Sequence, residues 1–206
     1  MVSHRVFLKT LFFLVAVTFL PLGRMAFAAE GPRTPVEAFH TALLTSMKDA
    51  ATKDAKARYA ALEPAVGQAF HMALIARLAT SEFWDKATDD QRKRLVQAFQ
   101  RFGISRLVSL FDGYSGETFD TVSDRAGSQG THVVLTKLNL PGKKPVGITY
   151  IVKEADKRWY IIDALLDDNI SELQVRRSEY RRILLDQGVD GLITVLDTKA
   201  KELLNG

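Results

Sequence analysis

The sequence predicts an α+β fold in which N- and C-terminal helices cover a four-stranded, mostly antiparallel, curved sheet. Up to about residue 114, apolar residues recur every three to four positions, the period of helices packed on a core. Between residues 117 and 166 the period changes to two, and after residue 171 it is helical again. The turns at 124–128 and 141–144 are short enough to join antiparallel neighbours. Helices, a four-strand meander and further helices define this fold class.

Composition and charge indicate a globular protein without a nucleic-acid partner. The 206 residues are 47% hydrophobic and 25% charged, as in ordinary globular proteins, and the formal net charge is +4. Residues 1–28 contain Arg5, Lys9 and Arg24 and no acidic residue, which leaves 25 of the 28 basic residues against all 24 acidic ones. Nucleic-acid binding needs a concentrated basic surface, which this nearly neutral remainder does not provide.

The first 28 residues have the three parts of a secretory signal peptide. A basic region precedes an apolar core from Leu11 to about Leu22, and Ala26-Phe27-Ala28 offers small residues for cleavage before Ala29. The apolar run is shorter than the ~20 residues that a membrane-spanning helix needs. With no cysteine, the chain has neither a disulfide nor a lipoprotein anchor. We therefore expect cleavage and one domain, residues 29–206, that is soluble after export. If the source is a Gram-negative bacterium, its location is the periplasm.

Three helical segments are predicted before the longest helix. The first begins near Pro35 and continues past Met47. The second begins at about Asp54 and is broken at Pro64, because proline disrupts a helix interior. Residues 70–78 are expected to be helical again.

The longest predicted helix has an unusually aromatic apolar side. It begins at Asp89, with Thr88 as an alternative N-cap, and ends near Asp112-Gly113. Phe99, Phe102 and Phe111 recur on it at helical spacing. Such rings either pack in a core or line a cavity, and both interpretations stay open at this point.

The last two predicted strands differ in their patterns. Residues 146–152 alternate, so that one face carries Val146, Ile148, Tyr150 and Val152. Residues 159–166 are apolar on both faces except at Asp163, which predicts a central strand covered on both sides. A carboxylate in such a strand must be paired, hydrogen-bonded or functional.

Arginines cluster on the helix that we expect to begin at Ser171 and to stop at Gly188. They are Arg176, Arg177, Arg181 and Arg182. Glu172 is spaced to pair with Arg176, and Glu179 with Arg182, as on an exposed helix face. The like-charged pair Arg177 and Arg181 lowers stability unless an anion or an acidic partner lies opposite.

No motif in the sequence indicates a metal site, a cofactor or catalytic residues. His40, His71 and His132 lie in separate elements without ligand spacing. Neither a nucleophile elbow nor a glycine-rich phosphate loop occurs. Two alternatives to a binding protein stay open. Asp163 and a nearby His132 could transfer protons in a small-molecule enzyme, or the apolar interior is the packed core of a periplasmic interaction module.

Two blocks of residues carry a family resemblance. The first contains Trp84, Thr88, Gln91-Arg92, Phe99 and Tyr114-Ser115-Gly116-Glu117. The second contains Trp159, Asp163, Ile170-Ser171, Glu179-Tyr180, Gly188-Val189-Asp190-Gly191-Leu192 and Leu196. In this order and spacing, behind a signal peptide, they resemble the MlaC family of periplasmic phospholipid carriers, also called toluene-tolerance proteins. Residues 111–117 are more similar to its hopanoid-associated branch. At Asp168-Asn169 the chain departs from the family, which usually has a glycine-containing turn there.

The resemblance implies a fold, an activity and partners. The fold is a helix-covered curved sheet related to the NTF2-like cone, with lipid acyl chains in its apolar cavity and no catalysis. The carrier, expected to be monomeric, moves phospholipid or a hopanoid-like lipid between an outer-membrane lipoprotein complex and an inner-membrane complex of an MCE protein and an ABC transporter. It docks on each only transiently, in support of membrane lipid asymmetry.

A soluble carrier of this kind needs a roomy apolar cavity. Exposing two acyl chains, about 30 methylenes, to water would cost roughly 24 kcal/mol. The predicted lipid-binding residues of the sheet are Val146, Ile148, Tyr150, Val152, Ile161 and Leu165. Those of the helices are Phe99, Phe102, Phe111 and Tyr180. Arg177 and Arg181 are the candidate contacts to a headgroup or a partner.

Overall fold

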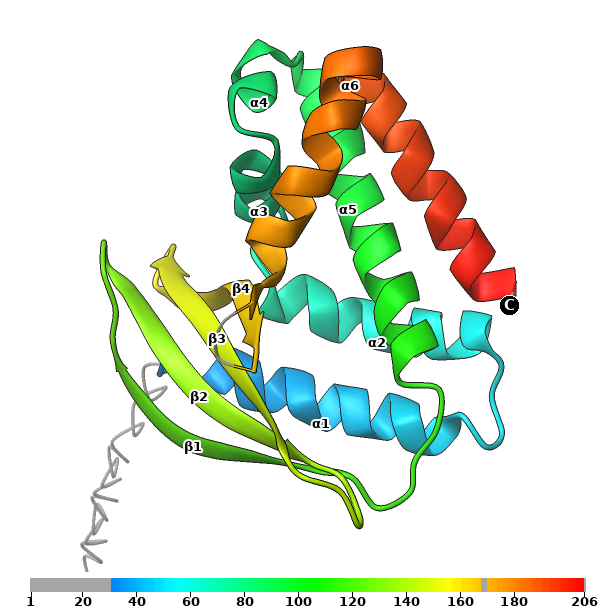
Figure 1. Cartoon of the computed structure of the whole chain (residues 1–206), viewed down its shortest axis with the longest axis vertical. Coiled ribbons are helices and arrows are strands. Elements are labelled where there is room, and N and C mark those ends of the chain that lie inside the picture. Colours follow the sequence, from blue (N-terminus) through cyan, green and yellow to red (C-terminus); the bar gives the residue numbers. More distant parts are fainter. Residues whose placement is uncertain (1–30, 168–169, 206) are drawn as a thin grey trace, which may run out of the picture.

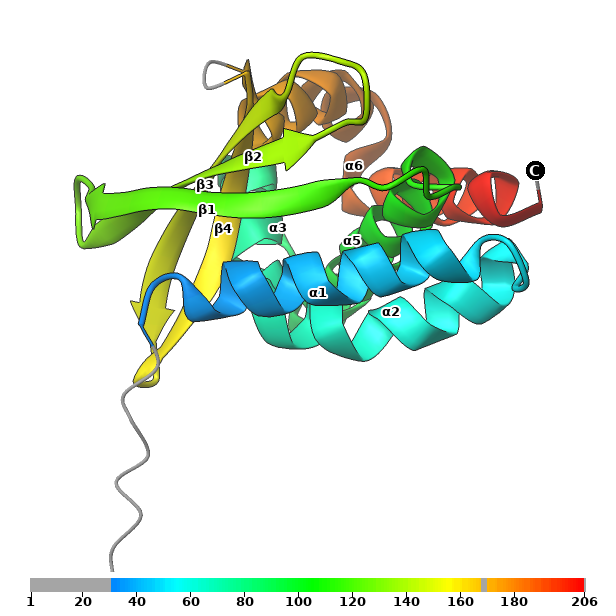
Figure 2. The same cartoon turned by 90° about the horizontal axis from the view of Figure 1, so that it is seen from below.

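The helices lie on one face of a curved antiparallel sheet (Figures 1 and 2). The computed structural model describes residues 31–167 and 170–205. The expected signal peptide, residues 1–28, and the departure from the family pattern at Asp168-Asn169 lie outside the described residues.

Six helices and five strands build the described part of the chain. The helices are α1 (Thr34–Asp49), α2 (Ala55–Ala69), α3 (Met72–Thr80), α4 (Glu82–Lys86), α5 (Asp89–Leu110) and α6 (Glu172–Asn205). The strands are β1 (Thr118–Ala126), β2 (Thr131–Asn139), β3 (Val146–Ala155), β4 (Arg158–Leu166) and β5 (Ile170–Ser171). They lie in the sheet in sequence order, and neighbours are antiparallel. The predicted α+β class is confirmed, with one strand more than expected, since a two-residue strand has no period to detect.

The predicted break at Pro64 is wrong. Helix α2 continues through Pro64 to Ala69. Leu62 and Val66, on either side of the proline, are each 1% exposed and anchor both halves of the helix in the core. This burial outweighs the hydrogen bond that proline cannot donate. Phe70, expected to be helical, has extended backbone and pairs with β4 in an isolated bridge, so α3 begins only at Met72.

A kink at Gly188 folds α6 back along α5 (Figure 1). Gly188 has φ 68°, in the left-handed region that glycine adopts without a steric cost. The C-terminal half of α6 buries Leu192 and Leu196 completely. Arg101 on α5 donates hydrogen bonds of 2.9 and 3.1 Å to the two carboxylate oxygens of Asp197, which holds the returning half in place.

A β-bulge in β4 changes which residues face the helices. Ile151 of β3 lies opposite Asp163, but the next residue, Val152, lies opposite Ile161. Ile162 is therefore an extra residue between two regular pairings. Because strand side chains alternate with period two, one extra residue reverses the alternation beyond it.

A buried histidine joins α1 to the sheet. His40 is 4% exposed, stacks on the ring of Phe119 of β1 at 4.0 Å, and lies 3.0 Å from the hydroxyl of Tyr150 on β3. Burial lowers the pKa of His40 to about 4, because the imidazolium loses its hydration. His40 is therefore neutral in the folded protein at pH 7.

The neutral state of His40 predicts a loss of stability in weak acid. Between the folded pKa of about 4 and the unfolded value of 6.5, the unfolded chain binds more protons, so stability falls as the pH decreases through this window. His40→Gln removes the titration and keeps a polar group near Tyr150. Urea unfolding at pH 7 and at about pH 4.5 should show a loss smaller by about 2 kcal/mol in this variant than in the parent.

His132→Gln is the matched control, since the His132 side chain is half-buried against the Trp159 ring. It should keep the parental pH dependence. An equal acid loss in His40→Gln and the parent would contradict the neutral, buried state of His40.

Candidate functional site

An apolar cavity of about 320 Å³ lies between the sheet and the helices. Helices α1, α2, α3, α5 and α6 and strands β1, β3 and β4 contribute to its wall. Its aromatic lining consists of Phe39, Phe70, Phe99, Phe102, Phe111, Phe119, Tyr150 and Tyr180. Leu110 and Leu166 also line it and are 61% and 37% exposed, so the cavity reaches the protein surface near the end of α5 and the end of β4.

Six of the ten predicted lipid-binding residues lie in this wall. They are Phe99, Phe102, Phe111, Ile148, Tyr150 and Tyr180. The sequence therefore indicated which faces of β3, α5 and α6 point inward. Contact of these side chains with a lipid stays a prediction.

The other four predicted residues lie outside the wall. Val152 and Ile161 are completely buried in the core beneath the sheet, and Val146 packs half-buried against that core. Leu165 pairs with Thr149 of β3, whose neighbours Ile148 and Tyr150 face the cavity, so Leu165 points to the opposite face. The prediction treated Leu165 as in phase with Ile161, but the bulge at Ile162 reverses the alternation between them.

The sequence did not reveal the part of the wall contributed by α1, α2 and α3. Phe39 and Leu43 lie in the helix predicted from Pro35 past Met47, but a helical apolar period does not distinguish a packed core from a cavity wall. Nothing in the sequence marked Gly103 on α5 as a residue of the cavity wall. It lines the cavity, and a Cβ atom at this position would have no atom within 4 Å.

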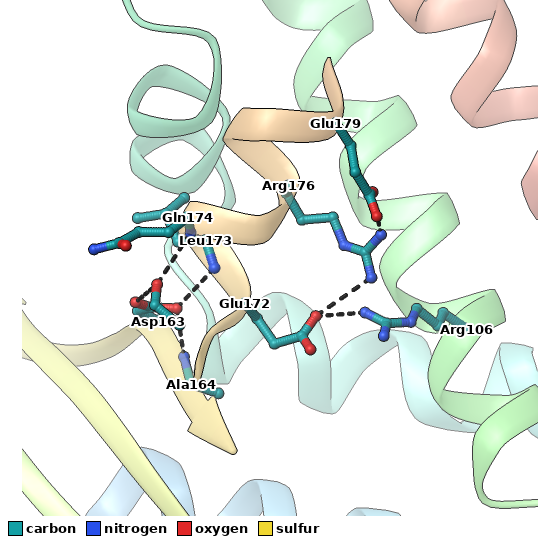
Figure 3. Close-up of polar contacts among 9 residues, drawn as sticks. Arg106, Asp163, Ala164, Glu172, Leu173, Gln174, Arg176 and Glu179 are labelled. Atoms are coloured by element: carbon teal, nitrogen blue, oxygen red, sulfur yellow. Dashed lines mark hydrogen bonds and ion pairs between the residues drawn. The ribbon is translucent and has the colours of Figure 1, made fainter. Parts of the chain in front are cut away.

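A chain of ion pairs crosses from α5 to α6 at the cavity wall (Figure 3). Arg106 donates to Glu172 at 2.6 Å, and Arg176 donates to the same carboxylate oxygen at 3.3 Å. Arg176 also donates to Glu179 at 2.6 Å and lies 5.8 Å from the centre of the Phe102 ring. Burial opposes ionisation of Glu172, but the hydrogen bond and charge of Arg106, together with those of Arg176, outweigh it and hold the pKa of Glu172 below its ordinary value.

Glu179 pairs with Arg176 and not, as predicted, with Arg182. Arg182 is instead 3.7 Å from Asp186, and its side chain is 91% exposed. The predicted pair of Glu172 with Arg176 is confirmed. Arg176 and Arg182 lie three residues from Glu179 on either side, so spacing alone does not choose between them, and the side of α6 that faces α5 is the one used.

Arg177 and Arg181, the predicted headgroup contacts, lie away from the apolar cavity. Arg181 donates to Glu82 on α4 at 3.2 Å, and Arg177 lines a separate surface groove beside the same carboxylate. Successive helical residues are turned by about 100°. The face of α6 that carries Arg176 and Tyr180 therefore points to α5, and the adjacent face, which carries Arg177 and Arg181, points to α3 and α4. An acidic partner therefore does lie opposite the like-charged pair.

Asp163 fixes the start of α6. One carboxylate oxygen accepts from the backbone N–H groups of Ala164 at 2.8 Å and Leu173 at 3.0 Å (Figure 3). The other accepts from the hydroxyl of Ser171 at 2.6 Å, whose oxygen in turn accepts from the N–H of Gln174 at 3.0 Å. Ser171 is thus the helix cap that the sequence predicted. The expected central, doubly covered strand is wrong for β4, which has only the two-residue β5 beyond it.

His132 and Asp163 do not form the proton-transfer pair considered from the sequence. His132 lies opposite Val152 of β3, and Asp163 is on the strand beyond, so their backbones are about 10 Å apart, twice the strand spacing. His132 packs edge-on against the ring of Trp159, at 4.9 Å between centres. Both oxygens of Asp163 are already bonded at the start of α6.

Among residues 31–167 and 170–205, no group of three His, Cys, Asp or Glu side chains is arranged to hold a metal ion. Within the same residues, no helix combines the length and apolarity needed to cross a membrane.

Fold and site together define a class: an α+β protein whose helices and curved antiparallel sheet enclose an apolar cavity with a charged margin. The chain belongs to the MlaC family, since the family model described as MlaC protein matches residues 37–198. A solved structure with a similar fold is the phospholipid-binding protein from Ralstonia solanacearum in complex with a phospholipid. It shares 18% sequence identity, and the alignment covers 84% of this chain and 99% of that chain, with a TM-score of 0.73. No curated protein sequence matches the chain.

The contacts of Asp163 predict a stability effect of Asp163→Asn. An amide offers one acceptor oxygen where the carboxylate uses two, so at least one bond at the start of α6 is lost. We expect the free energy of unfolding in urea to fall by about 1–2 kcal/mol. Asp186→Asn, which removes an exposed carboxylate on the same helix, should change it by less than about 0.5 kcal/mol. Equal effects of the two substitutions would argue against this role of Asp163.

Proposed function

We propose that this protein is a periplasmic lipid carrier that holds acyl chains in the cavity between its sheet and helices. The observation that carries the proposal is an apolar, aromatic-lined cavity in a member of the MlaC family. Its volume of about 320 Å³ lies near the lower end of ligand pockets, which range from about 300 to 1,000 Å³. The opening at Leu110 and Leu166 lets a longer ligand extend to the surface.

Physical chemistry favours a lipid over a polar ligand. Each buried methylene gains about 0.8 kcal/mol relative to water, so long acyl chains supply a large driving force toward an apolar cavity. Polar groups of the wall lie mainly where α5 and α6 meet, which leaves the surfaces of α1, α3 and β3 to the chains. The Ralstonia solanacearum protein, whose structure contains a phospholipid, has the same fold and supports this assignment.

The proposal includes the export of the protein, its monomeric state and the complexes between which it moves lipid. Residues 1–28 act as a signal peptide, and residues 29–206 form a single, monomeric, non-enzymatic carrier. It shuttles phospholipid or a hopanoid-like lipid between an outer-membrane lipoprotein complex and an inner-membrane complex of an MCE protein and an ABC transporter. The separation of Asp163 from His132 removes the geometric basis for the enzyme alternative. The cavity disfavours an interaction module with a simply packed core.

Gly103→Phe should fill the cavity and lower the amount of bound lipid. The new ring grows from the helical face that carries Phe99 and Arg106 into space with no atom within 4 Å of its Cβ. Replacing a helical glycine also favours the helix by up to about 1 kcal/mol, so the variant should remain folded. Mass spectrometry of organic extracts from protein purified without detergent should show a several-fold loss of lipid.

Gly103→Ala is the matched control, because it makes the same backbone change and leaves the cavity almost unfilled. It should retain the parental lipid content. Parental lipid in a folded Gly103→Phe variant would contradict the assignment of the cavity. A parent protein that is empty and takes up no lipid from vesicles would contradict the carrier function.

A further inference from the structure

Two stripes of side chains, one from α5 and one from α6, meet at one end of the cavity. Helix α5 contributes Phe99, Phe102 and Arg106, and α6 contributes Glu172, Arg176 and Tyr180. Members of each stripe are three or four residues apart and so share one helical face. The charged members are partly exposed, with 34% of the Arg106 side chain open to solvent, whereas Tyr180 is only 3% exposed. The polarity of the wall thus decreases from the surface inward.

The hydroxyl of Tyr180 has no hydrogen-bond partner within the described parts of the chain, although this residue is almost completely buried. Its ring packs edge-on against Phe99, at 5.5 Å between centres, and it lines the cavity. The hydroxyl of Tyr150, the other tyrosine of the wall, is by contrast bonded to His40. The hydroxyl is not among the fully buried atoms that lack a partner, so it is reachable from the cavity that Tyr180 lines and is free to bond to a ligand group. Burial raises the pKa of Tyr180 to about 12, so the hydroxyl keeps its proton and can donate it in a hydrogen bond.

The guanidinium groups of Arg106 and Arg176 have N–H donors beyond those used in their ion pairs. Each guanidinium carries five N–H groups. Arg106 uses one nitrogen, toward Glu172, and Arg176 uses two, toward Glu172 and Glu179. Glu179 is not part of the cavity wall, so two guanidinium groups share the single carboxylate of Glu172 there. The charge of Asp163, also in the wall, is already offset by N–H donors at the start of α6. An anionic group with several acceptor oxygens suits this arrangement.

We propose that Arg106, Arg176 and Tyr180 form a binding site for the phosphodiester and the adjoining ester of a glycerophospholipid. Arg106 and Arg176 donate to the phosphate oxygens near the surface, and the hydroxyl of Tyr180 donates to an ester oxygen deeper in the cavity. Arg176 and Tyr180 are four residues, about 6 Å, apart along α6, a separation that a glycerol backbone can span. The site therefore selects phospholipids over uncharged lipids, hopanoid-like ones included. This inference rests on the proposed carrier function.

The test compares two lipids that differ only in the phosphate headgroup. Delipidated protein is incubated with vesicles that contain known amounts of dioleoylphosphatidylglycerol and dioleoylglycerol, and the bound lipids are quantified by mass spectrometry. After correction for vesicle composition, the parent should bind the phospholipid at least tenfold more than the diacylglycerol. Arg106→Gln should reduce this ratio several-fold through loss of the phospholipid. Tyr180→Phe should instead lower the bound amounts of both lipids several-fold, because both carry the ester to which its hydroxyl donates.

Both substitutions preserve the packing and the ion pair next to the altered group. Tyr180→Phe keeps the ring that packs on Phe99, and Arg106→Gln leaves Glu172 bonded to Arg176. Tyr114→Phe and Arg182→Gln make the same chemical changes at exposed positions outside the cavity and should leave both the bound amounts and their ratio unchanged.

The possible failures are distinguishable. A parental ratio near one, or a ratio that Arg106→Gln leaves unaltered, would overturn the phosphate contact. Parental binding of both lipids by Tyr180→Phe would overturn the ester contact, and in each case the carrier function stays intact. Binding of neither lipid by the parent would overturn the carrier function as well.

Discussion

The carboxylate of Asp163 fixes the junction on which the cavity depends. It accepts backbone hydrogen bonds from Ala164, in its own strand, and from Leu173, in the first turn of α6, so it joins the end of the sheet to the start of the helix. The direction of α6 follows from this junction. A helix that left β4 at another angle would not bring Arg176 and Tyr180 opposite α5. The half-buried acid that the sequence marked as needing a partner therefore both lies in the cavity wall and positions the helix that supplies Arg176 and Tyr180.

The cavity persists because the protein has two cores, one on each side of it. One core consists of α1, α2, the inner face of the sheet and the C-terminal part of α5, around residues such as Leu43, Val66 and Val152. The other consists of α3, α5 and α6, around Leu95, Leu192 and Leu196. Each group buries its own apolar surface, so stability does not require the space between them to be filled. This division separates the requirements of folding from those of ligand binding.

The sequence predicted those parts of the fold that local periodicity determines. Alternation assigned the inward face of β3, and the positions of Thr88 and Ser171 predicted where α5 and α6 begin. Non-local contacts decided the rest. The bulge at Ile162 has no sequence signature, and it reversed the orientation of Leu165. The choice between Arg176 and Arg177 as the cavity residue depends on a rotation of α6 that only its packing on α5 determines.

The proposed carrier must both hold a lipid and release it, and the two sides of its cavity suit these opposite needs. The cores that flank the cavity are apolar and densely buried, so they are the parts least suited to open. The link between α5 and α6 at the cavity margin is instead a chain of partly exposed ion pairs through Glu172, and such pairs contribute little net stability, about 0–1 kcal/mol each. An opening confined to these ion pairs therefore costs less than disruption of either core, because the remaining contact between α5 and α6 belongs to the second core. The acyl chains, which lose roughly 0.8 kcal/mol per methylene in water, would leave only toward another apolar environment. A weak polar margin over a strongly apolar cavity thus favours release at a membrane or a partner cavity over release into solvent.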